Sequence, residues 1–118
     1  MKTILIVEDE DILREVIKDE LVDADYKVID VATGKQCIEQ LEQITPDLII
    51  LDIKLPDISG LKLLEEIRKR HKALPILMCT AYNGFKDAYE IWSSNVSDYI
   101  VKPIDLEVFK EKIKRILG

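Results

Sequence analysis

The sequence has few of the side chains that bind transition metals. It holds one histidine, His71, and two cysteines, Cys37 and Cys79, which form no C-x-x-C pair. Structural zinc sites use clusters of cysteine and histidine at close spacing. A zinc site is therefore not predicted. Because both cysteines fall in apolar patterns, we expect them to be small buried core residues.

Long apolar runs are also missing. The longest include residues 4–7 and 48–51, whereas a membrane-spanning helix needs roughly 20 apolar residues. The first ten residues, MKTILIVEDE, lack the longer apolar segment and small-residue cleavage site of a secretory signal peptide. We therefore expect a cytoplasmic protein without a membrane partner.

Positive charge is in deficit. The formal net charge is −6 and the sequence pI is about 4.8, whereas proteins that bind nucleic acid directly present a basic face to its phosphates. Direct nucleic-acid binding is therefore not predicted. A length of 118 residues with 47% hydrophobic and 34% charged side chains is typical of one globular domain, which we expect to span residues 1–118.

Short runs rich in β-branched residues alternate along the chain with longer segments of helical periodicity. The predicted strands are residues 4–7, 28–32, 48–51, 76–79 and 99–101. Each is followed by a predicted helix, of which the fourth contains Tyr89 and Trp92 and the last begins after an N-cap at Asp105. The apolar positions that we expect on one face of the first helix are Ile12, Leu13, Val16, Ile17 and Leu21. Five strand–helix units predict an α/β fold, with a five-stranded parallel sheet flanked by five helices.

Polar side chains with chemical potential stand where the predicted strands end. Ligands bind at the carboxyl ends of the strands in such sheets. These positions are held by Glu8 and Asp9, Asp52, Thr80 and Lys102. Three carboxylates close together would repel one another, so either one is protonated or a cation is shared. Carboxylate oxygens without imidazole or thiolate favour a hard metal, most plausibly Mg²⁺.

Asp52 is the carboxylate best placed to act as a nucleophile. It is the single acid at the end of the predicted central strand, and aspartate forms acyl phosphates in phosphoryl-transfer proteins. The paired acids Glu8 and Asp9 suit metal binding better. Pro56 and Gly60 shape the turn that follows Asp52, which predicts backbone groups close to it.

Four motifs together resemble the receiver domain of a two-component response regulator, over essentially the whole chain. Each motif alone is common, but all four occur in order at predicted strand ends. They are VEDE with Glu8 and Asp9, LDIKLPDISG with Asp52, CTA with Thr80, and DYIVKP with Tyr99, Lys102 and Pro103. The resemblance implies a flavodoxin-like (βα)5 fold with strand order 2-1-3-4-5.

The resemblance also implies a role for each site residue. Asp52 is implied to be the phosphoacceptor. Glu8 and Asp9 are implied to bind Mg²⁺ together with Asp52 and the backbone carbonyl of Lys54, and Lys102 is implied to contact a phosphoryl oxygen. Glu8 stands where aspartate is more frequent in the family, so its manner of holding the metal is left open.

The resemblance further implies a conformational switch. Thr80 and Tyr99 are the implied switch pair, and the Lys102–Pro103 bond is implied to be cis. Phosphorylation adds about −1.5 to −2 charges, and we expect Thr80 to move to the new oxygens and Tyr99 to turn inward. This would alter the surface formed by the fourth helix, fifth strand and fifth helix.

The implied partners are a sensor histidine kinase or phosphotransfer protein, and a downstream protein or output domain. A homodimer formed through the surface of the fourth helix, fifth strand and fifth helix is a further possible partner. Such a domain is not an enzyme on external substrates, because its chemistry is limited to its own phosphorylation and slow dephosphorylation.

Two other function classes share features with this sequence. An aspartate-nucleophile phosphohydrolase expects an aspartate directly after the first strand, and this chain has Glu8 there. A flavodoxin-like FMN-binding module expects a phosphate loop rich in Ser, Thr and Gly after the same strand, where this chain has the acids of residues 8–11. Both classes fit the sequence less well than a receiver domain.

Overall fold

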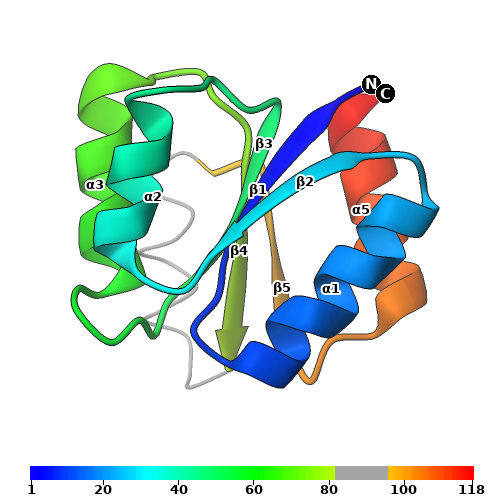
Figure 1. Ribbon diagram of the computed structural model, residues 1–118. Coiled ribbons are helices and arrows are strands. Elements are labelled where there is room, and N and C mark those ends of the chain that lie inside the picture. The colour runs from blue at the N-terminus through cyan, green and yellow to red at the C-terminus, as the bar shows by residue number, and fades with distance from the viewer. Residues whose placement is uncertain (82–95) are drawn as a thin grey trace.

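The computed structural model describes residues 1–81 and 96–118. Its elements, labelled as in Figure 1, are β1 (Thr3–Val7), α1 (Asp11–Asp23), β2 (Lys27–Val31), α2 (Gly34–Leu41), β3 (Leu48–Asp52), α3 (Gly60–Arg70), β4 (Ile76–Ala81), β5 (Asp98–Lys102) and α5 (Leu106–Leu117). The predicted fourth helix, with Tyr89 and Trp92, falls outside the described residues. Where the chain is described, no helix has the length and apolar character needed to cross a membrane.

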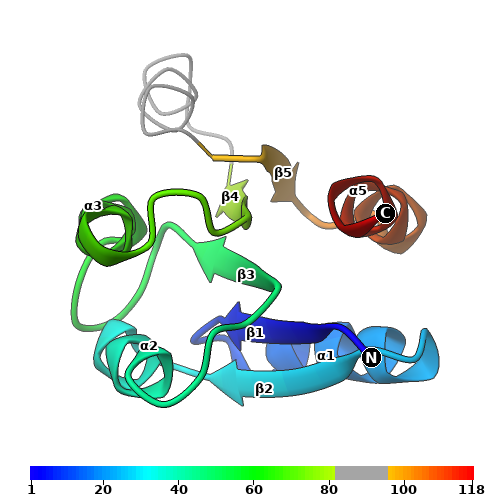
Figure 2. The same ribbon diagram turned by 90° about the horizontal axis from the view of Figure 1, so that it is seen from above.

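The strands form one parallel sheet in the order β2-β1-β3-β4-β5, so the predicted fold class and strand order are confirmed. Figure 2 shows α2 and α3 on one face of the sheet and α1 and α5 on the other. Parallel pairing places all the carboxyl ends of the strands at one edge. That edge is the lower one in Figure 1, where the β4 arrow ends and α1 begins.

The central strands are buried on both faces, which explains their continuous apolar runs. Successive side chains of a strand point to opposite faces. Leu5 and Val7 of β1 therefore join the core beneath α2 and α3, while Ile4 and Ile6 join the core beneath α1 and α5. Cys37 and Cys79 are almost fully buried in these two cores, as predicted.

The apolar face predicted for the first helix is only partly correct. Ile17 and Leu21 are buried and Leu13 packs beside them. Ile12 and Val16, however, are 78% and 40% exposed. Each helical residue is rotated about 100° from the one before it, so positions 12 and 16 lie beside the stripe that faces the sheet.

Helix ends are fixed by local polar groups. Asp105 caps α5 as predicted, because its carboxylate accepts hydrogen bonds from the amides of Glu107 and Val108. After α1, Asp25 takes the left-handed conformation with φ 68°, which lets the chain turn into β2. Aspartate tolerates this conformation better than most non-glycine residues do.

Candidate functional site

Three buried polar side chains gather at the carboxyl edge of the sheet. Among the residues described, the polar or charged side chains classed as buried are Glu8, Asp52 and Thr80, which are 2%, 4% and 5% exposed. Glu8 follows β1, Asp52 ends β3 and Thr80 lies in β4. Burial of charge costs free energy unless the charge is paired. Packing alone therefore does not explain why these side chains are buried here.

Lys102 compensates part of this charge. It is the last residue of β5, and its Nζ lies 2.8 Å from Glu8 Oε1 and 3.1 Å from Asp52 Oδ2. Burial lowers the pKa of Lys102, but the hydrogen bond with Glu8 and the charges of Asp52 and Glu8 outweigh it, so the pKa lies above its usual value. The ammonium is therefore held in its charged form between two carboxylates.

Glu8 keeps a proton more readily than an exposed glutamate. Burial raises the pKa of Glu8 to about 7, against the opposing effect of its hydrogen bonds with Lys102 and the Glu10 amide. The charge of Asp52 raises it further. One lysine thus does not fully offset two buried acids, and a second cation would be attracted.

The acid pocket has the composition of a site for a hard divalent cation. Glu8, Asp9 and Asp52 each place a carboxylate oxygen within 4.8 Å of the others, with Asp9 exposed to solvent. These donors fit Mg²⁺, which binds through one or two carboxylates and keeps several waters. In this arrangement Asp9 faces the solvent from which an ion and its waters would arrive.

The loop after Asp52 is folded tightly against it. The Gly60 amide donates to the Ile53 carbonyl at 2.6 Å, and Lys54 and Ser59 form an antiparallel bridge. The Lys54 amide donates to Asp52 Oδ1 at 3.2 Å. A side chain at Gly60 would clash with the carbonyl oxygen of Asp52 and lie 2.6 Å from the Ile53 Cα. Glycine is required there, in agreement with the turn predicted from the sequence.

Thr80 and Tyr99 lie on the same face of neighbouring strands. In the β4–β5 pairing, Met78 stands opposite Tyr99 and Thr80 opposite Val101, so Thr80 and Tyr99 are diagonal neighbours. The Thr80 hydroxyl donates to the Ala81 carbonyl at 3.2 Å, and the Tyr99 ring packs partly buried against the core beneath α2 and α3. The Lys102–Pro103 bond is cis.

One contact at the site was not anticipated from the sequence. Arg14 of α1 donates from Nη1 to the Glu8 carbonyl at 2.8 Å, and from Nε to Asp30 Oδ2 at 3.2 Å. It also binds Asp11 at 2.7 Å. The sequence gives no signal for the contact with Glu8, because the acceptor is a backbone carbonyl.

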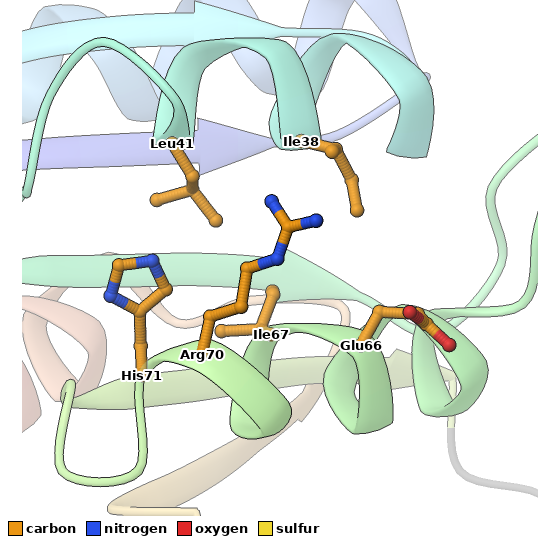
Figure 3. A pocket seen from close by; sticks show the side chains of 6 residues that line it. All are labelled: Ile38, Leu41, Glu66, Ile67, Arg70 and His71. Carbon is orange, nitrogen blue, oxygen red and sulfur yellow. The ribbon is translucent and has the colours of Figure 1, made fainter.

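Two pockets formed by the described residues differ in their position relative to the acid pocket. A small cavity of about 60 Å³ lies between α2 and α3, where Arg70 extends from α3 toward Ile38 and Leu41 of α2 (Figure 3). It is at the end of α3 remote from Asp52. A shallow pocket lined by Glu10, Leu13, Lys102, Pro103 and Ile104, in contrast, adjoins the acid pocket.

The described residues thus form a doubly wound parallel sheet with an acid pocket and a lysine at its carboxyl edge. The family model for the response regulator receiver domain matches residues 4–114. This chain therefore belongs to the response regulator receiver domain family.

Curated relatives and solved structures agree with this family assignment. The chain is 33% identical over 114 residues to the transcriptional regulatory protein PhoP of Escherichia coli K12, covering 97% of the chain and 51% of that protein. The virulence transcriptional regulatory protein PhoP of Salmonella typhimurium LT2 is 32% identical over 117 residues, which are 99% of the chain and 52% of that protein. The chain thus spans about half the length of these relatives.

Among solved structures, the response regulator TrrA of Thermotoga maritima in complex with Mg²⁺-BeF is 37% identical with a TM-score of 0.89, covering 99% of this chain and 100% of that one. The CheY-like receiver domain protein of Methanospirillum hungatei is 32% identical with a TM-score of 0.94, covering 99% and 94%. Chemotaxis response regulator CheY4 of Vibrio cholerae is 27% identical with a TM-score of 0.93, covering 99% of both chains.

Proposed function

We propose that residues 1–118 form a cytoplasmic receiver domain that accepts a phosphoryl group on Asp52 in a Mg²⁺-dependent reaction. The donor is a phosphohistidine of a sensor kinase or of a phosphotransfer protein. The observation that carries this proposal is the buried carboxylate of Asp52, held within reach of the acid pair Glu8 and Asp9 and of Lys102. A downstream protein or output domain then recognises the phosphorylated state.

The geometry supports direct attack by Asp52. Its Oδ1 accepts from the Lys54 amide and its Oδ2 from Lys102, so the carboxylate is oriented before a donor arrives. A carboxylate oxygen forms a bond to phosphorus as the bond from phosphorus to the donor nitrogen breaks, and the imidazole leaves with the electron pair. Lys102 then neutralises a phosphoryl oxygen, which is an electrostatic contribution aimed at the charge that develops.

The acid pair suits metal binding. Glu8, Asp9 and Asp52, with the Lys54 carbonyl, are the groups that would hold Mg²⁺. When bound, the ion screens the repulsion between the carboxylates and the incoming phosphoryl group. This proposal agrees with the Mg²⁺ named for the Thermotoga maritima relative.

The signal would leave through Thr80 and Tyr99. Their diagonal placement on β4 and β5 lets a shift of Thr80 toward the phosphoryl group open space beside the Tyr99 ring. A change from mostly inactive to mostly active requires that the active state bind the phosphoryl group better by about 5.5 kcal/mol. The surface that responds includes β5 and α5.

Intact-mass analysis after incubation with a small phosphodonor tests the proposal. The wild-type chain gains one phosphoryl group with Mg²⁺ and none after chelation, and Asp52→Ala gains none. Glu10→Gln is the matched control, because it removes an exposed acid next to the pair, and it is phosphorylated like the wild type. An Asp52→Ala chain that still takes up one phosphoryl group would refute the assignment. Steady turnover of a generic phosphatase substrate would favour a phosphohydrolase, and co-purified flavin would favour an FMN-binding module.

A further inference from the structure

The tip of the loop that follows Asp52 is fastened to a different helix. Asp57 accepts hydrogen bonds at 2.9 Å from two amides at the start of α2, with Oδ1 binding the Gly34 amide and Oδ2 the Lys35 amide. The first amides of a helix lack partners within the helix and favour a negative charge. The Gly34 and Lys35 amides lower the pKa of Asp57, so its carboxylate is charged at neutral pH.

The same junction is closed by packing. A side chain at Gly34 would clash with Cγ2 of Ile58, so the neighbour of Asp57 lies directly on the α2 backbone. Ile58 also packs against the core beneath α2 and α3. The loop tip therefore has a polar and an apolar attachment at one point.

The other end of this loop reaches the acid pocket. The Lys54–Ser59 bridge and the Gly60–Ile53 hydrogen bond close its base, and the Lys54 amide binds Asp52 Oδ1. A short loop held at the base and at the tip has little freedom at Lys54. Without the hydrogen bonds of Asp57, the loop would be restrained only by its base and by the packing of Leu55 and Ile58 against the core, among the contacts described for it.

We propose that Asp57 is a positioning residue for the phosphorylation site, because its attachment to α2 fixes the backbone of Lys54 beside Asp52. This inference rests on the proposed function, in which Lys54 supplies a backbone ligand to Mg²⁺. Asp57 is not one of the three acids that gather in the acid pocket. Removal of a group that orients a metal ligand typically lowers the affinity for the metal about tenfold or more.

The alternative is that Asp57 only caps α2. The helix offers a matched control, since Thr33 is a second cap whose Oγ1 accepts from the Gln36 amide at 3.1 Å. Thr33→Ala removes a cap from the same helix end and leaves both hydrogen bonds of Asp57 in place. A capping role predicts the same outcome for both substitutions, whereas a positioning role does not.

The test is calorimetric titration of Mg²⁺ into the unphosphorylated chain, for the wild type, Asp57→Ala, Asp57→Asn and Thr33→Ala. We expect Asp57→Ala to weaken Mg²⁺ binding about tenfold and Thr33→Ala to leave it unchanged, while both lower the melting temperature. Asp57→Asn loses the same charge as Asp57→Ala but keeps one acceptor, so its affinity falls between wild type and alanine. It also serves as the milder variant where alanine prevents folding.

Amide hydrogen exchange gives a second readout that needs no metal. The Lys54 and Gly60 amides are expected to exchange faster in Asp57→Ala than in Thr33→Ala. Equal Mg²⁺ affinities and equal exchange in these two variants would overturn the positioning role and leave the proposed function intact. A wild-type chain that binds no Mg²⁺ would overturn the proposed function first, and the inference with it.

Discussion

Lys102 donates a hydrogen bond of 2.8 Å to Oε1 of Glu8, a shorter contact than the 3.1 Å to Asp52 Oδ2. The lysine that we expect to meet a phosphoryl oxygen thus makes its shorter contact with Glu8, one of the acids that we propose to hold Mg²⁺. Binding of a cation at Glu8 would compete with this contact and release Lys102 toward Asp52. The two halves of the site are therefore linked through one ammonium group.

The first prediction concerns the pH dependence of folding without divalent ions. The pKa of Glu8 is about 7 in the folded chain, chiefly because of burial, against an ordinary value of 4.5. Between these values the folded chain binds a proton that the unfolded chain has lost, so stability falls as pH rises from about 4.5 to 7. The contribution of Glu8 is at most about 1.4 kcal/mol per pH unit. Urea unfolding across this range measures it.

Glu8→Gln removes this contribution, so the free energy of unfolding changes less with pH. Glu10→Gln is the control, since this neighbouring acid is exposed, and it keeps the wild-type slope. A Glu8→Gln chain whose stability falls as steeply as that of the wild type would contradict the prediction.

A second prediction concerns Lys102→Met. The change leaves Glu8 and Asp52 buried without their ammonium partner, and loss of one member of a buried ion pair costs about 3 kcal/mol. Urea unfolding at pH 8 without metal measures this loss, and added Mg²⁺ restores more stability to the variant than to the wild type. Phosphorylation of the variant with excess Mg²⁺ is slower by about 100-fold, because a charge aimed at the phosphoryl oxygens is missing. Lys110→Met, which removes a lysine from surface ion pairs on α5, leaves the rate unchanged.

A third prediction concerns the contact between Arg14 and the Glu8 carbonyl. Arg14→Lys keeps the charge but cannot reach the Glu8 carbonyl, Asp30 and Asp11 together, because an ammonium lacks the planar fork of a guanidinium. We expect a loss of about 1 to 2 kcal/mol in urea unfolding and severalfold weaker Mg²⁺ binding in calorimetry. Lys18→Met removes the other cation near Asp30 and is the control, with a loss of at most about 1 kcal/mol and unchanged Mg²⁺ affinity. If Arg14→Lys behaved like Lys18→Met, Arg14 would have no role at the acid pocket.

A fourth prediction concerns Gly60→Ala. The added methyl group clashes with the Asp52 carbonyl oxygen and crowds Ile53, so the loop must shift and Asp52 with it. Overpacking of this kind costs about 1 to 3 kcal/mol, and phosphorylation slows even at temperatures where the variant is fully folded. Ser59→Ala is the control, because it removes the α3 cap on the Lys62 amide without adding an atom near Asp52. It is less stable but phosphorylated at the wild-type rate.

The sequence was sufficient for the elements that depend on local pattern. The apolar runs of β1 and β3, the Asp105 cap and the grouping of Glu8, Asp9, Asp52 and Lys102 at one edge follow from periodicity and parallel pairing. The exposure of Ile12 differs from the prediction, because a rotation of about 100° on a helix separates a buried stripe from an exposed one.

The contacts of Arg14 and Asp57 could not be predicted for a different reason. Both side chains bind backbone groups, the Glu8 carbonyl in one case and the Gly34 and Lys35 amides in the other. Backbone groups are the same at every residue, so no pattern of side chains marks them. Such partners become visible only when the turns between strands and helices have defined positions.

The last prediction concerns the switch. Thr80 is 5% exposed. The hydrogen bond described for its hydroxyl is a long one, of 3.2 Å, to the carbonyl of Ala81. Thr80→Ala removes the donor that we expect to follow the phosphoryl group, so phosphorylation still occurs at Asp52 but no longer shifts β5. Amide chemical shifts of residues 98–102 and of α5, recorded before and after phosphorylation, measure the response. Thr80→Ser keeps the hydroxyl, so we expect it to retain the chemical-shift response to phosphorylation. A Thr80→Ala chain with the full wild-type response at Tyr99 would show that the signal leaves Asp52 by another route.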